Sequence, residues 1–419
     1  MALLGSMNFA ALTLCVLVLA AHNYQAQASS RVIFGKKNFK SFVNYNSSVN
    51  GLCATSVIIR GYKCQEFEVT TPDGYILSIQ RIPEGRYGVG SNVTKKEPVL
   101  IQHGVLVDGT TWFLNNPEQN LPMILADEGF DVWISNTRGT QYSRKHTTLD
   151  SSSQEYWNWS WDELVTDEMP AIVDFVYNQS GQQKINYVGH SLGTLVALAS
   201  FSKGILVDQL KSAVLLSPIA YLSHMTTELG VVAAKSMLGE TLTLMHMAEF
   251  DPKGVPVVDF MKGICAQTGI DCNHLFSSIT GENCCLDTSA FDLFMNFEPQ
   301  SSSTKNLFHL AQTVRSGVLT KFDYERPDAN FKHYRQVTPP IYNLSNIPNN
   351  LPIFMSYGGR DALSDVIDVN NLLEHFKYHD EDKLSLQFID NYAHADFIMA
   401  VNANDLVYKN VTSFFKRQF

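Results

Sequence analysis

The segment Gly189-His190-Ser191-Leu192-Gly193 is the feature that most restricts how this chain can fold. It joins the apolar run INYVG, residues 185–189, to the run LGTLVALASF, residues 192–201. The first run is a candidate buried strand, and the second reads as a helix. Glycines on both sides of the serine permit a sharp turn, at which larger side chains would collide. The segment therefore predicts a strand, a tight turn that presents Ser191, and a helix.

Similar apolar runs recur on both sides of this segment, and stretches with helical spacing separate them. The predicted strands are 98–102, 131–135, 185–189, 213–217, 351–357 and 384–389, and the predicted helices are 118–128, 162–178, 192–201, 366–378 and a terminal helix from 396. Residues 66–70 and 75–82 favour a β-hairpin around the turn Pro72-Asp73-Gly74. Short strands that alternate with helices indicate an α/β fold, with a mostly parallel sheet covered on both faces.

Residues 218–344 depart from this alternation. They combine helical segments, four cysteines and several methionines with few strand signals. Because the alternation resumes afterwards, the simplest topology is one α/β sheet interrupted by a helical insertion. We expect a core of residues 29–217 and 345–419 and a cap of residues 218–344. The chain has 419 residues, of which 45% are hydrophobic, so it has ample material for one large core.

The N-terminal residues predict the compartment. Residues 10–21 form an apolar run of signal-peptide length, and Ala26-Gln27-Ala28 supplies a cleavage pattern. We expect residues 1–28 to be a signal peptide and the protein to have no transmembrane anchor. It would be secreted or delivered to the vacuolar or lysosomal lumen. In that compartment N-x-S/T sequons indicate surface glycosylation, and the candidates are Asn46, Asn92, Asn158, Asn178, Asn343 and Asn410.

The charge of the chain argues against nucleic acid as a partner. The formal net charge is −10, and lysines and arginines are scattered rather than clustered. Nothing would offset the repulsion between this chain and phosphate groups, so we expect no nucleic-acid partner.

Six cysteines remain once Cys15 leaves with the signal peptide. We expect Cys53 to pair with Cys64 across a short loop. A bond between the neighbours Cys284 and Cys285 would bring two Cα atoms closer than disulfides prefer. Two pairings remain open: 265–284 with 272–285, or 265–285 with 272–284, involving Cys265 and Cys272. Disulfides are favoured over a metal site in this compartment, and we expect no metal.

A serine hydroxyl becomes a good nucleophile only when a base takes its proton and an acid orients that base. In folds with this turn, the acid and the histidine follow later in the chain, each at the end of a strand. Asp361 follows LPIFMSYGG, and His394 follows LSLQFIDNYA. Asp365 and Asp368 instead suit the cap and the interior of the next helix. We predict that Ser191 is the nucleophile, Asp361 the acid and His394 the base.

The negative charge that forms on the substrate oxygen needs backbone N–H donors. One donor is expected from Leu192, and the other from Val105 in the loop Gln102-His103-Gly104-Val105. We expect His103 and His190 to be structural or to lie on the oxyanion side.

Other polar residues have simpler interpretations. Asp396, two residues after His394, is expected to cap the last helix. For the histidines of the insertion we expect exposed or packed roles; they are His224, His246, His274, His309 and His333.

With these motifs placed, the chain resembles the acid lipase family, which includes gastric and lysosomal lipases and plant triacylglycerol lipases. The resemblance runs from about Tyr62 to the C-terminal region. It rests on the serine turn and on the segments TPDGYILSIQRIPEGR, QHG, NTRGTQYSRKH, PPIYNLSNI, GGRDALSD and YAHADF. It implies an α/β-hydrolase core with a helical cap and no cofactor. It also implies hydrolysis of neutral lipid esters at a lipid–water interface and acid pH.

By matching motif, the resemblance assigns the same triad and the same oxyanion donors. Animal members usually carry Gln where this chain has Leu192, and Trp near Met399. Both differences concern acyl-chain preference rather than the triad.

Two other function classes stay open at this point. One is a steryl-ester hydrolase or an acyltransferase that shares the acyl-enzyme, and the other is a non-catalytic lipid-binding protein on the same scaffold. The apolar, Met-rich stretch Gly230 to Phe250 suggests that part of the cap is a mobile lid over an acyl groove. An ordinary packed helix of the cap is an equally good interpretation of that stretch.

Overall fold

The computed structural model describes residues 51–88, 96–227, 230–231, 234, 247–254 and 275–418. These residues belong to one compact unit, Phe42–Phe419. Several predictions fall outside the described residues: the signal peptide, most of the proposed lid stretch, and the residues Asn46, Asn92, His246, Cys265, Cys272 and His274.

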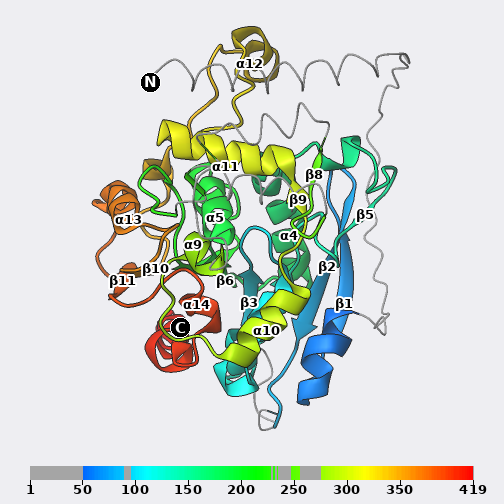
Figure 1. The fold of residues 1–419 in the computed structure, drawn as a ribbon. Helices are drawn as coiled ribbons and strands as arrows, with labels where there is room; N and C mark the ends of the chain where they lie inside the picture. Colours follow the sequence, from blue (N-terminus) through cyan, green and yellow to red (C-terminus); the bar gives the residue numbers. More distant parts are fainter. Residues whose placement is uncertain are drawn as a thin grey trace, which may run out of the picture. The chain divides into compact units, whose positions relative to one another are not determined.

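The main sheet has the strand order β1-β2-β4-β3-β6-β7-β10-β11, with β5 paired to β2 (Figure 1). β1 and β2 form the predicted antiparallel hairpin, and β2 pairs antiparallel with β4. The six strands β4, β3, β6, β7, β10 and β11 run parallel to one another. The bounds are β1 Gln65–Thr70, β2 Tyr75–Ile82, β3 Pro98–Gln102, β4 Asp131–Ser135, β5 Lys145–His146, β6 Ile185–His190, β7 Leu210–Leu216, β10 Ile353–Gly358 and β11 Leu384–Ile389. The predicted α/β fold with a mostly parallel sheet is confirmed.

Alternate side chains of the central strands pack into two separate clusters. In β4, Trp133 joins one cluster, whereas Val132 and Ile134 join the other. The first cluster includes helices α4 (Met169–Gln179) and α5 (Leu192–Ser202), and the second includes α2 (Leu121–Asp127) and α15 (Lys409–Lys416). Helices therefore cover both faces, which explains why these strands are apolar throughout rather than alternating.

Two predicted helices differ in detail. The helix expected over 162–178 consists of α3 (Trp161–Glu163), a π-helical turn at Leu164–Glu168 and then α4. The terminal helix is interrupted: α14 spans Asp396–Met399, and helical structure resumes at Asn404. Between them Ala400 is extended and bridges to Leu286, while the Val401 N–H donates to the Cys285 carbonyl. Pairing with a segment distant in sequence thus overrides helix continuation at this point.

Between β7 and β10 the regular structure of the described residues consists mainly of helices. Their helices are α9 (Leu275–Thr280), α10 (Thr288–Phe297), α11 (Thr304–Ser316) and α12 (Pro327–Tyr334). A small antiparallel pair, β8 (Glu249–Phe250) and β9 (Ser302–Ser303), accompanies them. After β10, Asp365 accepts the Ile367 N–H at the start of α13 (Val366–Leu373), and Asp368 lies inside that helix, both as predicted.

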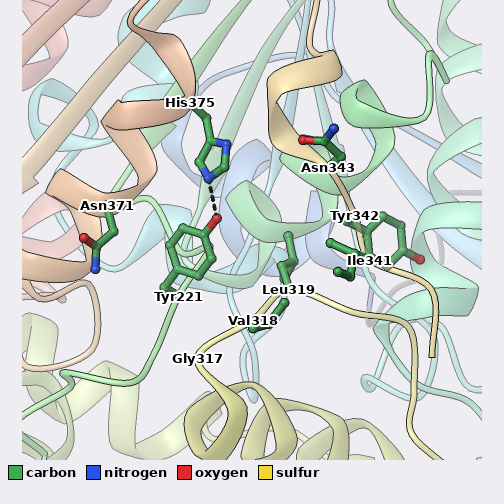
Figure 2. Close-up of a pocket in the computed structure, with 9 residues that line it drawn as sticks. All are labelled: Tyr221, Gly317, Val318, Leu319, Ile341, Tyr342, Asn343, Asn371 and His375. Atoms are coloured by element: carbon green, nitrogen blue, oxygen red, sulfur yellow. Dashed lines mark hydrogen bonds between the residues drawn. The ribbon is translucent and has the colours of Figure 1, made fainter. Parts of the chain in front are cut away.

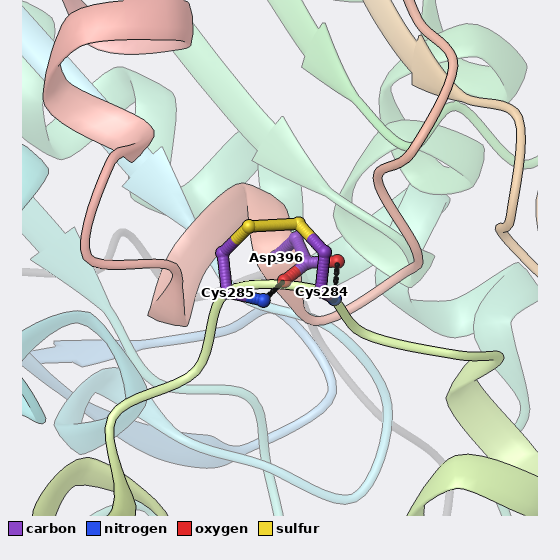
Figure 3. A group of neighbouring side chains, drawn as sticks. All are labelled: Cys284, Cys285 and Asp396. Atoms are coloured by element: carbon purple, nitrogen blue, oxygen red, sulfur yellow. Dashed lines mark hydrogen bonds between the residues drawn. A yellow bond between two sulfur atoms is a disulfide. The ribbon is translucent and has the colours of Figure 1, made fainter.

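The disulfide between Cys53 and Cys64 is present as predicted, with Cα atoms 5.5 Å apart. The predicted pairings of Cys284 and Cys285 are wrong, because the structure joins these two neighbours to one another with Cα atoms 3.7 Å apart (Figure 3). The N–H groups of both residues donate to the two carboxylate oxygens of Asp396, at 3.1 and 3.2 Å. One buried carboxylate therefore holds the tight turn in which the two side chains meet. These sulfur atoms and Asp396 also form a cluster of metal-ligand type, but the disulfide removes both thiolates.

Arg138, in the segment NTRGT after β4, contacts three side chains from other segments of the chain. Its guanidinium is fully buried, lies 3.0 Å from Glu168 and 2.5 Å from Asp73, and stacks over the ring of Tyr75. Glu168 is only 3% exposed. Removing the cation would leave that carboxylate buried without its partner.

We therefore expect Arg138→Met to lower the free energy of unfolding by about 3–5 kcal/mol in chemical denaturation. Arg144→Met is the matched control, since Arg144 pairs with Glu249 at a partly exposed site. That variant is expected to lose less than about 1 kcal/mol. Equal losses in the two variants would contradict the buried-network interpretation.

Candidate active site

Ser191 lies at the turn between β6 and α5, as predicted. Its backbone has φ 54° and ψ −119°, a conformation that a non-glycine residue adopts only when its surroundings hold it there. A side chain at Gly193 would come within 2.8 Å of the Gln102 carbonyl, and one at Gly189 within 2.8 Å of the Gly193 backbone. The glycines of the motif thus let β6, α5 and the end of β3 approach one another.

Asp361 and His394 come from the loops after β10 and β11, which are paired in parallel. His394 Nδ1 lies 3.0 Å from each carboxylate oxygen of Asp361, and both residues are buried. The other ring nitrogen, Nε2, is buried and has no hydrogen-bond partner within the described residues. The structure therefore brings the predicted acid and base together and leaves one imidazole nitrogen available.

The turn that carries Ser191 contacts the loop of His394 through the preceding residue, His190. His190 Nε2 donates to the His394 carbonyl at 3.0 Å, and the two rings are 4.8 Å apart. A side chain at Gly104 would come within 3.0 Å of the Ser191 Cβ. The ends of β3, β6 and β11 thus converge at one edge of the sheet, where ligands of open α/β sheets bind.

The electrostatics favour an ionised acid beside the imidazole. Burial alone would raise the pKa of Asp361. The opposing effects of the His394 charge and hydrogen bond, with the N–H groups of Ser364 and Leu363, hold that pKa below its usual value. A carboxylate that stays ionised can fix the tautomer of the base and stabilise it when it is protonated.

The two predicted oxyanion donors are Leu192, directly after Ser191, and Val105, directly after Gly104, which lies against Ser191. Leu192 is the first residue of α5, so its N–H has no partner inside the helix. The N–H of Val105 donates to no backbone carbonyl among the described residues. Both groups follow the points where β6 and β3 reach the edge of the sheet.

His103 and His190 are buried and hold the backbone around the site. The Thr137 N–H donates to His103 Nε2 at 3.0 Å, so the Nδ1 of that ring donates to the Gly104 carbonyl. Burial lowers the pKa of His103 to about 4 and the pKa of His190 to about 3. Both rings are therefore neutral and bond to backbone groups, which agrees with the structural one of the two roles that the sequence left open.

Segment 280–286 contacts the histidine loop, a relation that the sequence analysis missed. The His394 N–H donates to the Thr280 carbonyl at 3.0 Å, and the Ala395 N–H donates to Asn283. Asp396 does not cap its helix by the expected side-chain bond. Its carboxylate instead accepts the N–H groups of Ala393, Cys284 and Cys285. The spacing His-x-Asp in YAHADF was the available signal, but Cys284 and Cys285 lie more than a hundred residues before Asp396.

Three histidines of the insertion are described, and each has a partner other than the predicted triad. His309 is buried and stacks on Trp161, His333 stacks on Tyr324, and His224 pairs with Asp368. A surface pocket of about 340 Å³ lies beside His375, whose ring bonds to the Tyr221 hydroxyl at 2.7 Å (Figure 2). None of the predicted triad lines that pocket.

Four predicted glycosylation positions are described, and all are exposed: Asn158, Asn178, Asn343 and Asn410. Within the described residues, no helix is both long enough and apolar enough to cross a bilayer.

Comparisons with known proteins agree with this geometry. A family model for a partial α/β-hydrolase lipase region matches residues 53–116, and one for the α/β hydrolase fold matches residues 97–242. Triacylglycerol lipase 2 of Arabidopsis thaliana is 58% identical over 89% of this chain and 89% of its own length. Gastric triacylglycerol lipase of Rattus norvegicus is 34% identical over 88% of this chain and 92% of its own.

A solved structure with the same fold is a soluble variant of monoglyceride lipase from Saccharomyces cerevisiae, bound to a substrate analogue. Its TM-score is 0.53 at 13% identity, covering 90% of this chain and 99% of that one. From the extent of identity with its relatives, the chain belongs to the acid lipase family, whose members are carboxylic ester hydrolases with the α/β-hydrolase fold.

Proposed function

We propose that this protein is a secreted or lumenal lipase that hydrolyses neutral lipid esters, including triacylglycerols, through an acyl-enzyme on Ser191. The observation that carries the proposal is the His394 ring, bound through Nδ1 to Asp361, with an Nε2 that has no partner among the described residues and a backbone that bonds to the nucleophile turn. The names of its relatives support acylglycerol esters as the substrate class. The predicted signal peptide and the exposed sequons support the lumenal or extracellular location.

The first half of the reaction acylates the serine. His394 Nε2 takes the hydroxyl proton while the oxygen of Ser191 attacks the ester carbonyl carbon. Asp361 stabilises the resulting imidazolium, and the N–H groups of Leu192 and Val105 bind the oxyanion. When the tetrahedral intermediate collapses, the imidazolium returns its proton to the departing alcohol oxygen. The products are the free alcohol and the acyl-enzyme.

In the second half, water replaces the alcohol. His394 removes a proton from water, the hydroxide attacks the acyl carbon, and the serine leaves with that proton. No cofactor enters either half. We also propose that residues 29–217 and 345–419 form the catalytic core and that residues 218–344 form the cap. Part of that cap would be a lid over the acyl groove.

A substrate panel tests this proposal. We expect the purified protein to release acid from emulsified tributyrin and triolein, with Ser191→Ala as the inactive reference. The measurement is titration of released acid between pH 4 and pH 9. Hydrolysis restricted to water-soluble esters would contradict the lipase assignment. A clear preference for cholesteryl oleate, or transfer to added alcohol in place of hydrolysis, would instead favour a steryl-ester hydrolase or an acyltransferase.

A further inference from the structure

Residues 298–300, which follow α10, form hydrogen bonds with the loop after β3, residues 103–108. The N–H of Asp108 donates to Glu298 Oε1 at 3.1 Å, and the Gln300 N–H donates to the Leu106 carbonyl at 2.7 Å. Leu106 has φ 58°, a conformation that costs a leucine roughly 1 kcal/mol or more. External hydrogen bonds therefore help to hold this loop, which carries the predicted oxyanion donor Val105, in its shape.

Two carboxyl groups meet at that contact. Asp108 and Glu298 are both fully buried, and the bond from the Asp108 N–H to Glu298 Oε1 places their carboxyl groups close together. Asp108 Oδ1 also accepts the Thr110 N–H at 2.7 Å, but Asp108 Oδ2 and Glu298 Oε2 meet no hydrogen-bond donor among the described residues. Two buried carboxyl groups in contact cannot both be ionised at moderate cost, so the pair retains a proton.

The polar neighbours of the pair include the amide side chains of Gln141 beside Asp108 and of Gln300 beside Glu298, both of which are uncharged. The ionisable groups facing it are the hydroxyl of Tyr142 and, behind that hydroxyl, the carboxylate of Glu66. The ammonium of Lys253 donates to the carbonyl of Phe297, the residue before Glu298, and not to either acid. Burial raises the pKa of Asp108. Burial and the neighbouring Asp108 charge both raise the pKa of Glu298.

We propose that Glu298 is a positioning residue, which holds the oxyanion loop only while it shares a proton with Asp108, and that loss of this proton sets the alkaline limit of activity. This inference rests on the proposed function, because Val105 matters only if Ser191 is acylated. When the proton leaves, two negative charges face one another in a buried site. Their repulsion separates residues 298–300 from the loop and displaces the Val105 N–H.

The sign of the effect follows from the raised pKa values. In the unfolded chain both carboxyl groups titrate near their ordinary values, whereas in the folded protein the pair keeps a proton to higher pH. Its stabilising contribution is complete below the ordinary carboxyl pKa and is lost as pH rises through the raised pKa. The loop is therefore held most firmly at acid pH.

Glu298→Gln tests the proposal with little change in shape. The amide oxygen can still accept the Asp108 N–H, and the amide NH₂ can donate to the Asp108 carboxylate at every pH. We expect the ratio of kcat at pH 8 to kcat at pH 5 to rise at least about tenfold above that of the wild type, a shift of one pKa unit. KM should change much less, because an oxyanion donor acts on the transition state. A soluble short-chain ester, followed by acid release, is the substrate.

Three further variants complete the test. Glu298→Ala, which loses the bond altogether, is expected to lower kcat at acid pH, where the wild-type contact is intact. Asp162→Asn is the matched control, since Asp162 is also a buried acid with a raised pKa but bonds to Phe322 and Tyr342. It should leave the ratio unchanged. If Glu298→Gln does not fold, Asp108→Asn is the alternative variant, because it also replaces one carboxyl group of the pair by a neutral amide.

An unchanged ratio in the folded Glu298→Gln or Asp108→Asn protein, with Ser191→Ala inactive, would reject this inference alone. Full activity of Ser191→Ala would reject the proposed function instead. Melting temperatures by circular dichroism at each pH separate the loop effect from global unfolding.

Discussion

Replacing Ser191 by alanine is expected to lower kcat for ester hydrolysis by about 10⁶-fold. The acyl-enzyme needs the serine oxygen, and without it the imidazole and the oxyanion donors can assist only a direct attack by water. The measurement is the rate of acid release at saturating short-chain ester, compared with the uncatalysed rate. The variant should still bind substrate, because the groove and the backbone donors remain.

Ser200→Ala provides the matched control for this loss. Ser200 lies on the same helix α5, is buried, and its hydroxyl has no partner among the described residues. The chemical change is identical, but no bond is lost, so kcat should stay within about twofold of the wild type. Substantial activity in Ser191→Ala would mean that another residue is the nucleophile.

Asp361→Asn is expected to lower kcat by about 10⁴-fold while the protein stays folded. The amide NH₂ can turn toward His394 Nδ1 and donate to it, which places the ring proton on Nε2 and removes the base from the serine. Asp365→Asn is the matched control, because asparagine caps a helix as well as aspartate does. Comparable losses in the two variants would contradict the assignment of the acid.

The same carboxylate predicts a pH dependence of stability. The pKa of Asp361 is held below its usual value in the folded protein, so its contribution is present above the ordinary carboxyl pKa. That contribution is lost as pH falls through the lowered pKa. Asp361→Asn should therefore melt with a weaker dependence on pH at the acid end than the wild type.

Most of the sheet could be predicted because its strands are buried on both faces. Runs such as PVLIQ and DVWIS contain no exposed residue, so burial and sequence pattern agree there. The serine turn and the order of the acid and the histidine were predictable for a related reason. Each belongs to a local strand end, and parallel strands bring their carboxyl ends to one edge.

What the sequence did not predict depends on contacts between distant segments. The terminal helix stops at Ala400 because that residue bridges to Leu286. Cys284 bonds to Cys285 where one carboxylate, Asp396, binds both backbone N–H groups. Glu298 looks like an ordinary surface acid in a sequence. Only the folded chain shows that it is buried against Asp108.

The position of the insertion has a consequence for synthesis. β7 pairs with β10, residue 213 with residue 353, although the whole insertion separates them, and the histidine follows later still. Because chains emerge from the ribosome N-terminus first, the proposed nucleophile Ser191 is made long before the proposed base His394. A polypeptide stalled before residue 394 carries no such imidazole. If Ser191 and His394 act as proposed, an unfinished chain cannot hydrolyse esters, because activity requires the loop that follows β11.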